Sequence, residues 1–252
     1  MSADAHTTAS PTLRRRRRAA ATQEIVEAAE SYIAGHGPHA LSLRGVARNL
    51  GMTVQGLYHY FPNRDALVTV LVTKAYRELA AAVSAAADTA ADEPAVLRFV
   101  AAAEGYRRWA ITHVERFQLL YGAPLPHYAA PHNGPTTQAM HRMCEIFQRE
   151  MFAGFTTAQM TAADVRGLSP ALHTHLQPLF PHGSETLPPP ASALLLGAWG
   201  HLHGMVVLEV FGHTSFIGEH QAEIFHRAMF DLFEDIHRRI PAQLTGTPAT
   251  HP

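Results

Sequence analysis

The chain has 252 residues, of which 47% are hydrophobic and 16% charged, and its formal net charge is −1. This composition supplies ample apolar side chains for a core, and it excludes a disordered chain and a protein that coats nucleic acid along its whole length. The only cysteine, Cys144, excludes an intramolecular disulfide and favours a reducing compartment.

The charge is divided unevenly along the chain. Residues 1–66 contain eight arginines against five acidic residues, whereas the rest contains twelve lysines and arginines against sixteen acidic residues. A basic head on an acidic body predicts that only the head meets a polyanion.

The N-terminal segment combines small polar residues with a run of five arginines, Arg14–Arg18. Because like charges in a run repel one another, we expect a disordered basic arm over residues 1–19. No apolar run follows the arginines, which argues against a secretory signal and favours a cytoplasmic location. The alternatives for the arm are contact with an anionic partner and a merely solvated tail.

Helical spacing begins after the arm. Apolar residues from Ile25 to Ile33 recur on one helical face, and Gly35, Gly37 and Pro38 end the pattern. Short helices are predicted at 43–50 and 54–61. Asn63 is a suitable N-cap for a fourth helix.

The turn between the two short helices carries the strongest signal. Gly51 lies where two helices cross steeply and a positive φ is expected, and Ala47 keeps the first helix thin. Ser42 and Thr53 are natural N-caps for the two helices. This pattern predicts a helix-turn-helix whose second helix enters the major groove of DNA, and a plain helical hairpin is the alternative.

The predicted DNA contacts follow from side-chain chemistry. Gln55 can hydrogen-bond base edges, most favourably those of adenine, whereas hydroxyl, imidazole and guanidinium groups nearby suit phosphates. The arginine run would add contacts to phosphate or to an adjacent minor groove. The expected DNA-binding residues are Ser42, Arg44, Thr53, Val54, Gln55, Tyr58, His59 and Arg64.

The rest of the chain is also predicted to be helical. A helix opens at Pro94, and others are expected at 116–121, 136–159, 191–212 and 218–240. Prolines make 123–135 a loop, and 167–190 reads as an irregular connection with one short helix. The 191–212 segment contains histidines and a glutamate, so we interpret it as a buried core helix and not as a membrane span.

The head resembles the TetR (tetracycline-repressor-like) family of bacterial regulators from about Ala20 to Leu71. The resemblance is carried by the segments 41–47 and 50–53, and above all by the string Gly56-Leu57-Tyr58-His59-Tyr60-Phe61-Pro62-Asn63-Arg64-Asp65-Ala66-Leu67. The body is similar to one TetR C-terminal type, the WHG type, through residues 198–206 and Glu209. The resemblance implies an all-helical homodimer of about nine helices that acts as a repressor released from DNA by a small ligand.

These observations divide the chain into four parts. We expect the basic arm at 1–19, a helix-turn-helix DNA-binding domain at 20–68, a helical effector-binding and dimerisation domain at 69–240, and a tail at 241–252. The helix at 191–212 is apolar on nearly every side, and the helix at 218–240 has one wide apolar stripe, which together predict a homodimer through both helices. The alternative is that both helices are core elements of a monomer.

A pocket for a small hydrophobic ligand is predicted in the body, where aromatic residues are frequent. Two histidines could supply polar contacts inside it. The predicted lining is Trp109, His113, Phe117, Tyr121, Phe152, Trp199 and His203. Histidines two residues apart on a helix do not share a face, so the 18 histidines do not indicate a metal site, and no cofactor is expected.

Three functions remain as alternatives. The leading hypothesis is a ligand-released repressor that binds a palindromic operator as a dimer. A second keeps DNA binding but makes the body a protein-interaction module or the protein an activator without a small ligand. An enzyme is disfavoured because the chain carries no phosphate-binding loop, nucleophile-elbow or zinc-protease motif.

Overall fold

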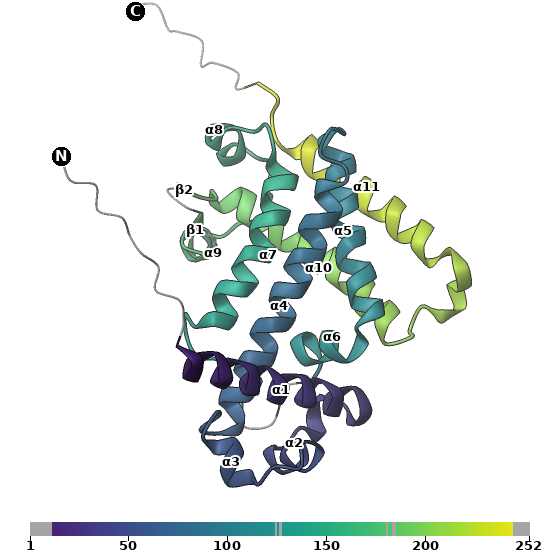
Figure 1. Ribbon diagram of the computed structural model, residues 1–252. Coiled ribbons are helices and arrows are strands. Elements are labelled where there is room, and N and C mark those ends of the chain that lie inside the picture. Colours follow the sequence, from purple (N-terminus) through teal and green to yellow (C-terminus); the bar gives the residue numbers. More distant parts are fainter. Residues whose placement is uncertain (1–11, 124, 126–127, 180, 183–184, 244–252) are drawn as a thin grey trace, which may run out of the picture. The chain divides into compact units, whose positions relative to one another are not determined.

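The computed structural model describes residues 12–123, 125, 128–179, 181–182 and 185–243, and these are almost entirely helical (Figure 1). They form eleven α-helices, two 3-10 helices and one antiparallel pair of two-residue strands, β1 (Pro181–His182) and β2 (Glu185–Thr186). The all-helical fold class expected from the sequence is confirmed.

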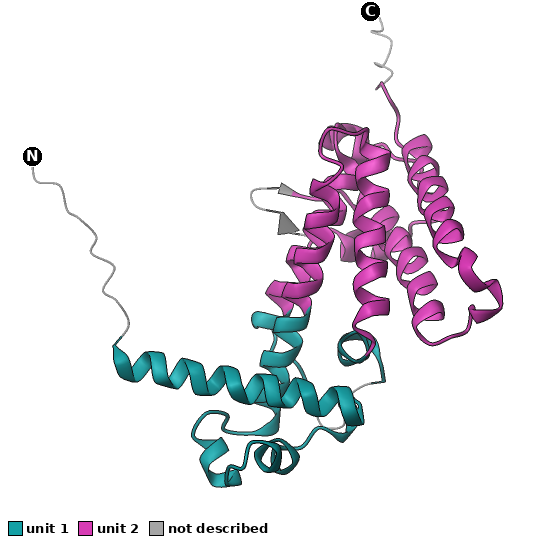
Figure 2. Cartoon of the chain, turned by 45° about the vertical axis from the view of Figure 1, so that its right-hand side comes forward, with its two compact units in different colours: residues 1–75, 115–136 teal, residues 76–114, 137–252 magenta. Residues whose placement is uncertain are grey.

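The chain divides into two compact units (Figure 2). Unit 1 comprises residues 1–75 and 115–136, and unit 2 comprises residues 76–114 and 137–252. The segment 115–136 therefore belongs to the same unit as the head, a contribution that the sequence-based division does not contain. One long helix, α4 (Arg64–Asp88), runs from unit 1 into unit 2.

Unit 1 contains the head and one helix from later in the chain. Its elements are α1 (Leu13–His36), η1 (Pro38–Ala40), α2 (Leu43–Asn49), α3 (Val54–Tyr58), the first part of α4 (Arg64–Asp88) and nearly all of α6 (Val114–Tyr121).

Unit 2 contains the remaining helices. Its elements are the end of α4, α5 (Ala95–Thr112), α7 (Pro135–Phe152, apart from its first turn), α8 (Thr157–Thr161), α9 (Pro170–Leu176), the two short strands, α10 (Pro189–Val210), η2 (Ser215–His220) and α11 (Gln221–Arg239). The two short helices α8 and α9 lie between the long ones and raise the helix number above the nine that the family resemblance implies.

The core of unit 1 lies beneath α1, α2 and α3. Ile25 and Ile33 are buried on α1, as the helical spacing predicts, and Val46 and Leu57 are fully buried on α2 and α3. Gly45 allows α2 to approach α1, because a Cβ at this position would lie 2.6 Å from the ring of Tyr32. The head therefore has a small core, and the long helix α1 packs over it.

The core of unit 2 is aromatic. The ring of Phe99 on α5 lies 6.3 Å from Phe147 on α7 and 5.6 Å from Phe233 on α11, measured between centroids. Helix α5 packs against both α10 and α11. Gly105 permits α5 to approach α4 closely, because a Cβ there would lie 2.6 Å from that of Ala86.

The predicted disordered arm is wrong for residues 13–19, because α1 begins at Leu13 and includes Arg14–Arg18. Arginine and alanine both favour helix, and the amide of Arg16 already donates to the carbonyl of Thr12 over 3.1 Å. The backbone preference of this arginine–alanine stretch outweighs the repulsion among the exposed guanidinium groups. Residues 1–11 of the predicted arm and residues 244–252 of the predicted tail lie outside the described residues.

Two predicted helices have different limits in the structure. The helix expected at 136–159 ends at Phe152, because Gly154 adopts φ +88° and Thr156 starts α8 with a capping box that includes Gln159. The last helix begins at Gln221 instead of residue 218, because Gly218 has φ +64°, which no right-handed helix accommodates.

Among the described residues, α10 is the one helix long and apolar enough to cross a membrane, and 39% of its most apolar window is buried inside the protein. A single such helix is weak evidence for a span, since core helices have the same composition. Its buried side includes Leu195, Ala198 and Leu202, which agrees with the predicted core helix on that side.

Candidate functional site

Helix α3 presents a polar face outward. Leu57 is fully buried beneath it, whereas Gln55, Tyr58 and His59 are exposed and Val54 is half-buried. The one-turn helix is too short to be stable alone, so its orientation depends on the Leu57 anchor and on its cap. The three exposed side chains form a surface patch that could meet the edges of bases.

The two predicted N-caps are confirmed. The hydroxyl oxygen of Ser42 accepts from the N–H of Gly45, and that of Thr53 accepts from the N–H of Gly56, each over 3.1 Å. Gly51 has the expected positive φ, +64°. Since a hydroxyl that accepts one bond still has a hydrogen to donate, both residues can contact a phosphate without giving up the cap.

Arg64 is engaged within the head. Its Nε donates to the carbonyl of Leu41 over 2.9 Å, which ties the start of α4 to the residue before Ser42. Arg44 is exposed on α2, as a phosphate contact requires, and its neighbours Arg48 and Asn49 are exposed as well.

Arg18 was expected only as part of a mobile arm, but it packs on the end of α3. Its Nη2 donates to the carbonyl of His59 over 2.9 Å, and its guanidinium carbon lies 5.7 Å from the ring centroid of Tyr60. This contact joins residues 41 positions apart. No short-range pattern could reveal it, because it depends on how α1 crosses the head.

An acidic residue on α1 fastens this helix within unit 1. The carboxylate of Glu30 lies 2.6 Å from Nζ of Lys74 on α4 and 3.7 Å from a guanidinium nitrogen of Arg116 on α6. The head is therefore braced by α6, which explains why residues 115–136 belong to unit 1.

The predicted ligand-binding residues of the body fall into several places. Trp199 stacks on His203 with centroids 5.0 Å apart, and Nδ1 of His203 lies 2.8 Å from the hydroxyl of Tyr106. The ring of Phe147 lies 6.2 Å from that of Tyr106. Tyr106 and Phe147 complete an aromatic cluster but are not among the predicted pocket residues. We call these four residues the Tyr106 cluster.

The other predicted residues lie elsewhere. Trp109 stacks on His113 at 5.2 Å between centroids, and Nδ1 of His113 is bonded to the carbonyl of Trp109. Phe117 and Tyr121 are paired on α6 in unit 1. Phe152 lines the cavity along α7 that is described below, and none of the other six predicted residues lines that cavity.

An ion pair joins Arg107, which follows Tyr106 on α5, to Glu209 on α10. Both Arg107 and Glu209 have only 12% of their side chains exposed, and two guanidinium nitrogens of Arg107 donate to the two carboxylate oxygens of Glu209. Such a two-point bond fixes the register of α5 against α10.

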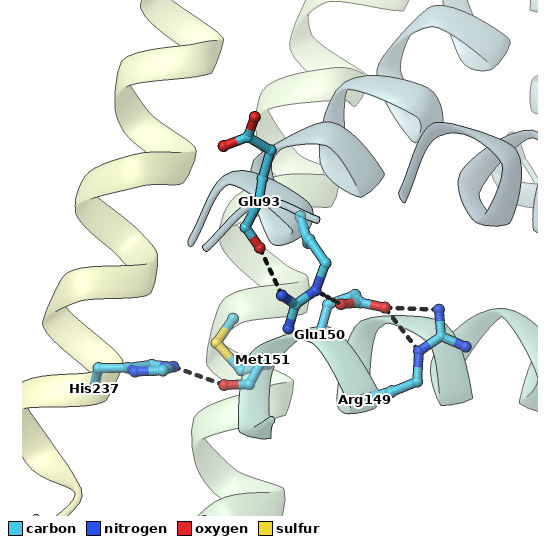
Figure 3. Close-up of polar contacts among 6 residues, drawn as sticks. Glu93, Arg149, Glu150, Met151 and His237 are labelled. Carbon is cyan, nitrogen blue, oxygen red and sulfur yellow. Dashed lines mark hydrogen bonds and ion pairs between the residues drawn. The ribbon is translucent and has the colours of Figure 1, made fainter. Parts of the chain in front are cut away.

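A second polar network joins α5, α7 and α11 (Figure 3). The buried carboxylate of Glu150 accepts from Nε of Arg98 over 3.0 Å and from Nε of Arg149 over 2.7 Å. In the same region, Nε2 of His237 donates to the carbonyl of Met151 over 2.8 Å.

Titratable groups in unit 2 are shifted mainly by burial. Burial lowers the pKa of His203, and it lowers the pKa of His237 against a smaller raising effect of the bond to Met151. Burial raises the pKa of Cys144 to about 11, which keeps its thiol protonated. The part of the chain that the structure describes contains no group of three or more His, Cys, Asp or Glu residues placed to hold a metal ion.

A cavity of about 530 Å³ that is widely open to solvent lies along α7. Its walls combine charged, apolar and amide side chains from α7, α8 and the segment before α10. The lining residues are Arg142, Glu145, Ile146, Gln148, Arg149, Phe152, Ala153, Met160 and Leu187.

Comparison with known families gives two matches that together span most of the chain. The sequence profile of "Bacterial regulatory proteins, tetR family" matches residues 25–71, which include α2 and α3. The profile of "Tetracyclin repressor-like, C-terminal domain" matches residues 99–232.

Individual relatives agree with the family matches. The HTH-type transcriptional regulator Rv1816 of Mycobacterium tuberculosis is 33% identical over 194 residues, which cover 75% of this chain and 80% of the relative. A crystal structure of the regulatory protein SCO4313 superposes with a TM-score of 0.69 at 31% identity, covering 88% of this chain and 98% of the other. A protein of unknown function from Rhodococcus sp. RHA1 shares the fold with a TM-score of 0.62 at 22% identity, covering 92% and 99% of the two chains.

Proposed function

The chain belongs to the TetR family of bacterial transcriptional regulators, and from this premise we propose that it binds a palindromic operator as a homodimer and is released by a small hydrophobic ligand. It is a DNA-binding regulator, and we infer that it binds its partners without catalysing a reaction. We infer a cytoplasmic location, where DNA is accessible.

DNA recognition is carried by the outward face of α3. Gln55 and His59 are exposed while Leu57 anchors the same helix in the core, so the anchor and the reading surface lie on opposite sides. A helix of this kind fits the major groove. We assign base contact to Gln55, with Val54 beside it, and phosphate contact to Ser42, Arg44, Thr53, Tyr58 and His59.

The arginines have two roles in this proposal. Arg14–Arg17 extend along the exposed N-terminal turns of α1, where they can reach phosphates beside the recognised groove. Arg18 holds α1 to the end of α3 and so positions the other four. Arg64 ties the start of α4 to the Leu41 carbonyl, and we assign it a phosphate contact as well.

The dimer is proposed to form through α10 and α11. On α10, Leu196 and Leu208 are 41% and 45% exposed, and a Cβ at Gly197, Gly200 or Gly204 would meet nothing within 4 Å. On α11, Ile224 is 45% exposed. Exposed leucines beside glycines form a thin apolar surface that a second copy can approach closely, as in an isologous interface.

The ligand is proposed to act on the Tyr106 cluster. Burial keeps His203 neutral, so its ring can exchange a hydrogen bond with Tyr106 or with a polar group of the ligand. The Arg107–Glu209 pair connects α5 to α10, the helix assigned to the dimer. A ligand that shifts α5 against α10 would therefore change the spacing of the two heads and lower operator affinity.

A footprint on the DNA that flanks the protein's own gene tests the proposal. We expect a protected palindrome, and we expect Gln55→Ala with His59→Ala to weaken binding at fixed salt by about tenfold or more. Gln138→Ala with His175→Ala removes the same side-chain types from exposed positions of unit 2 and should leave affinity unchanged. Equal affinity of the two double variants for the operator would refute the assignment of α3 as the reading helix.

A further inference from the structure

The cavity along α7 has the features of a ligand site distinct from the Tyr106 cluster, because no residue of that cluster lines it. Its volume of about 530 Å³ is within the range of small-molecule pockets, roughly 300–1,000 Å³. The lining comes from three segments, with Met160 on α8 and Leu187 just before α10 facing the residues of α7.

Gln148 is the most informative residue of the wall. It is only 6% exposed, and its Oε1 is buried without a hydrogen-bond partner among the described residues. A buried acceptor without a partner destabilises the fold, and an apolar side chain of similar size would avoid this cost. A ligand that donates a hydrogen bond to Oε1 would satisfy the amide.

The charges on the wall favour an anion. Arg149 is held by Glu150, which Arg98 also neutralises (Figure 3). Arg142 is exposed and forms no ion pair with any described residue, and Glu145 is the only acidic residue among the described residues that line the cavity. The three arginines and two glutamates named here together carry one net positive charge.

We propose that the α7 cavity is an effector site for a small apolar carboxylic acid that also carries a hydroxyl or amide donor. The carboxylate pairs with Arg142, the donor bonds Oε1 of Gln148, and the apolar body packs on Phe152, Met160 and Leu187. The regulatory meaning of this site rests on the proposed function, whereas binding itself does not.

The cavity is placed to influence the helices assigned to the dimer. Helix α8 packs against α10, and Nε2 of Gln159 on α8 donates to the carbonyls of Pro241 and Ala242, which follow the C-cap of α11, Ile240. A ligand that joins α7 to Met160 and Leu187 therefore braces segments next to both α10 and α11.

Calorimetric titration of the full-length protein without DNA tests the site, with 3-(4-hydroxyphenyl)propanoate as the probe. We expect saturable binding that weakens about 5–10-fold for 3-phenylpropanoate, which lacks the donor, and by a similar factor for 4-propylphenol, which lacks the carboxylate.

In Gln148→Leu the preference for the phenolic acid should disappear, and in the exposed α7 control Gln138→Leu it should remain. Arg142→Gln should weaken the phenolic acid about 3–10-fold, whereas Arg108→Gln, exposed on α5, should not.

The melting temperature separates a ligand-binding role from a structural one. Because Gln148→Leu removes a buried acceptor without a partner, it should raise the melting temperature of the unliganded protein by roughly 2–8 °C. A lower melting temperature, no binding of the probe at millimolar concentration, or equal affinity in wild type and Gln148→Leu would each overturn the proposal. If the wild-type protein binds the probe as expected but does not bind the operator, the result counts against the proposed function alone.

Discussion

The helix caps of the head are local contacts, whereas the principal side-chain hydrogen bonds of unit 2 join residues far apart in sequence. In the head, Ser42, Thr53 and Asn63 each cap a helix by accepting from an N–H three residues later. In unit 2 the main polar contacts join residues far apart in sequence: 97 positions separate Tyr106 from His203, and 102 separate Arg107 from Glu209. The head therefore presents its reading surface largely by local geometry, whereas unit 2 can transmit a displacement between distant helices.

Replacing Glu209 by alanine should have the largest effect and tests the long-range side of this comparison. The substitution leaves Arg107 as a nearly buried cation without its two-point acceptor, so we expect unfolding to become easier by about 3–5 kcal/mol. Urea denaturation checks the value. Glu223→Ala, whose side chain is 84% exposed beside His220, should change stability little. Comparable losses in the two variants would show that the Arg107–Glu209 pair does not hold α5 to α10.

Replacing Gly45 by alanine should have an intermediate effect and tests the head. The new Cβ would lie 2.6 Å from the Tyr32 ring, so the ring or α2 must move, and we expect a loss of about 1–3 kcal/mol. Gly35→Ala is the matched control on α1, where a Cβ meets nothing within 4 Å, and it should be neutral or slightly stabilising.

A second substitution isolates the cause of the Gly45 effect. Tyr32→Leu in the Gly45→Ala background should recover part of the lost stability, because the two sites are in contact and their effects are not additive. Strict additivity of the two changes in thermal unfolding would mean that the approach of α2 to α1 does not depend on the Tyr32 ring.

The same difference in range explains what could be predicted from the sequence. The caps at Ser42 and Thr53 and the positive φ of Gly51 were predictable because each requirement lies within a few residues. The contact of Gly45 with Tyr32 and that of Arg18 with His59 were not, because both depend on how α1 crosses the head. Sequence periodicity gave no sign of them.

In unit 2 the helices were predictable but their breaks and partners were not. The apolar period continues through Phe155, so it hid the end of α7 that the positive φ of Gly154 produces. Of the residues expected to line one pocket, Trp199 and His203 belong to the Tyr106 cluster, Trp109 stacks on His113, Phe117 and Tyr121 are paired on α6, and Phe152 lines the α7 cavity. Composition identifies aromatic residues, but only the packing of helices decides which of them meet.

The pH dependence of stability should be the smallest effect, and it sharpens the comparison because the two shifted histidines both lie in unit 2. The pKa of His203 and that of His237 are lowered in the folded protein, chiefly by burial, so the unfolded chain takes up protons at a higher pH than the native state does. Their contribution to stability is therefore present above the usual histidine pKa of about 6.5 and is lost as the pH falls below it.

Urea denaturation between pH 7.5 and 5.5 should show this decline in stability. The substitution His203→Asn should reduce the decline, whereas His175→Asn, an exposed control on α9, should not. Because protonation of His203 would also disturb its bond with Tyr106, a decline that is unchanged in His203→Asn would show that this residue is not buried in the neutral form that the proposed ligand contact requires.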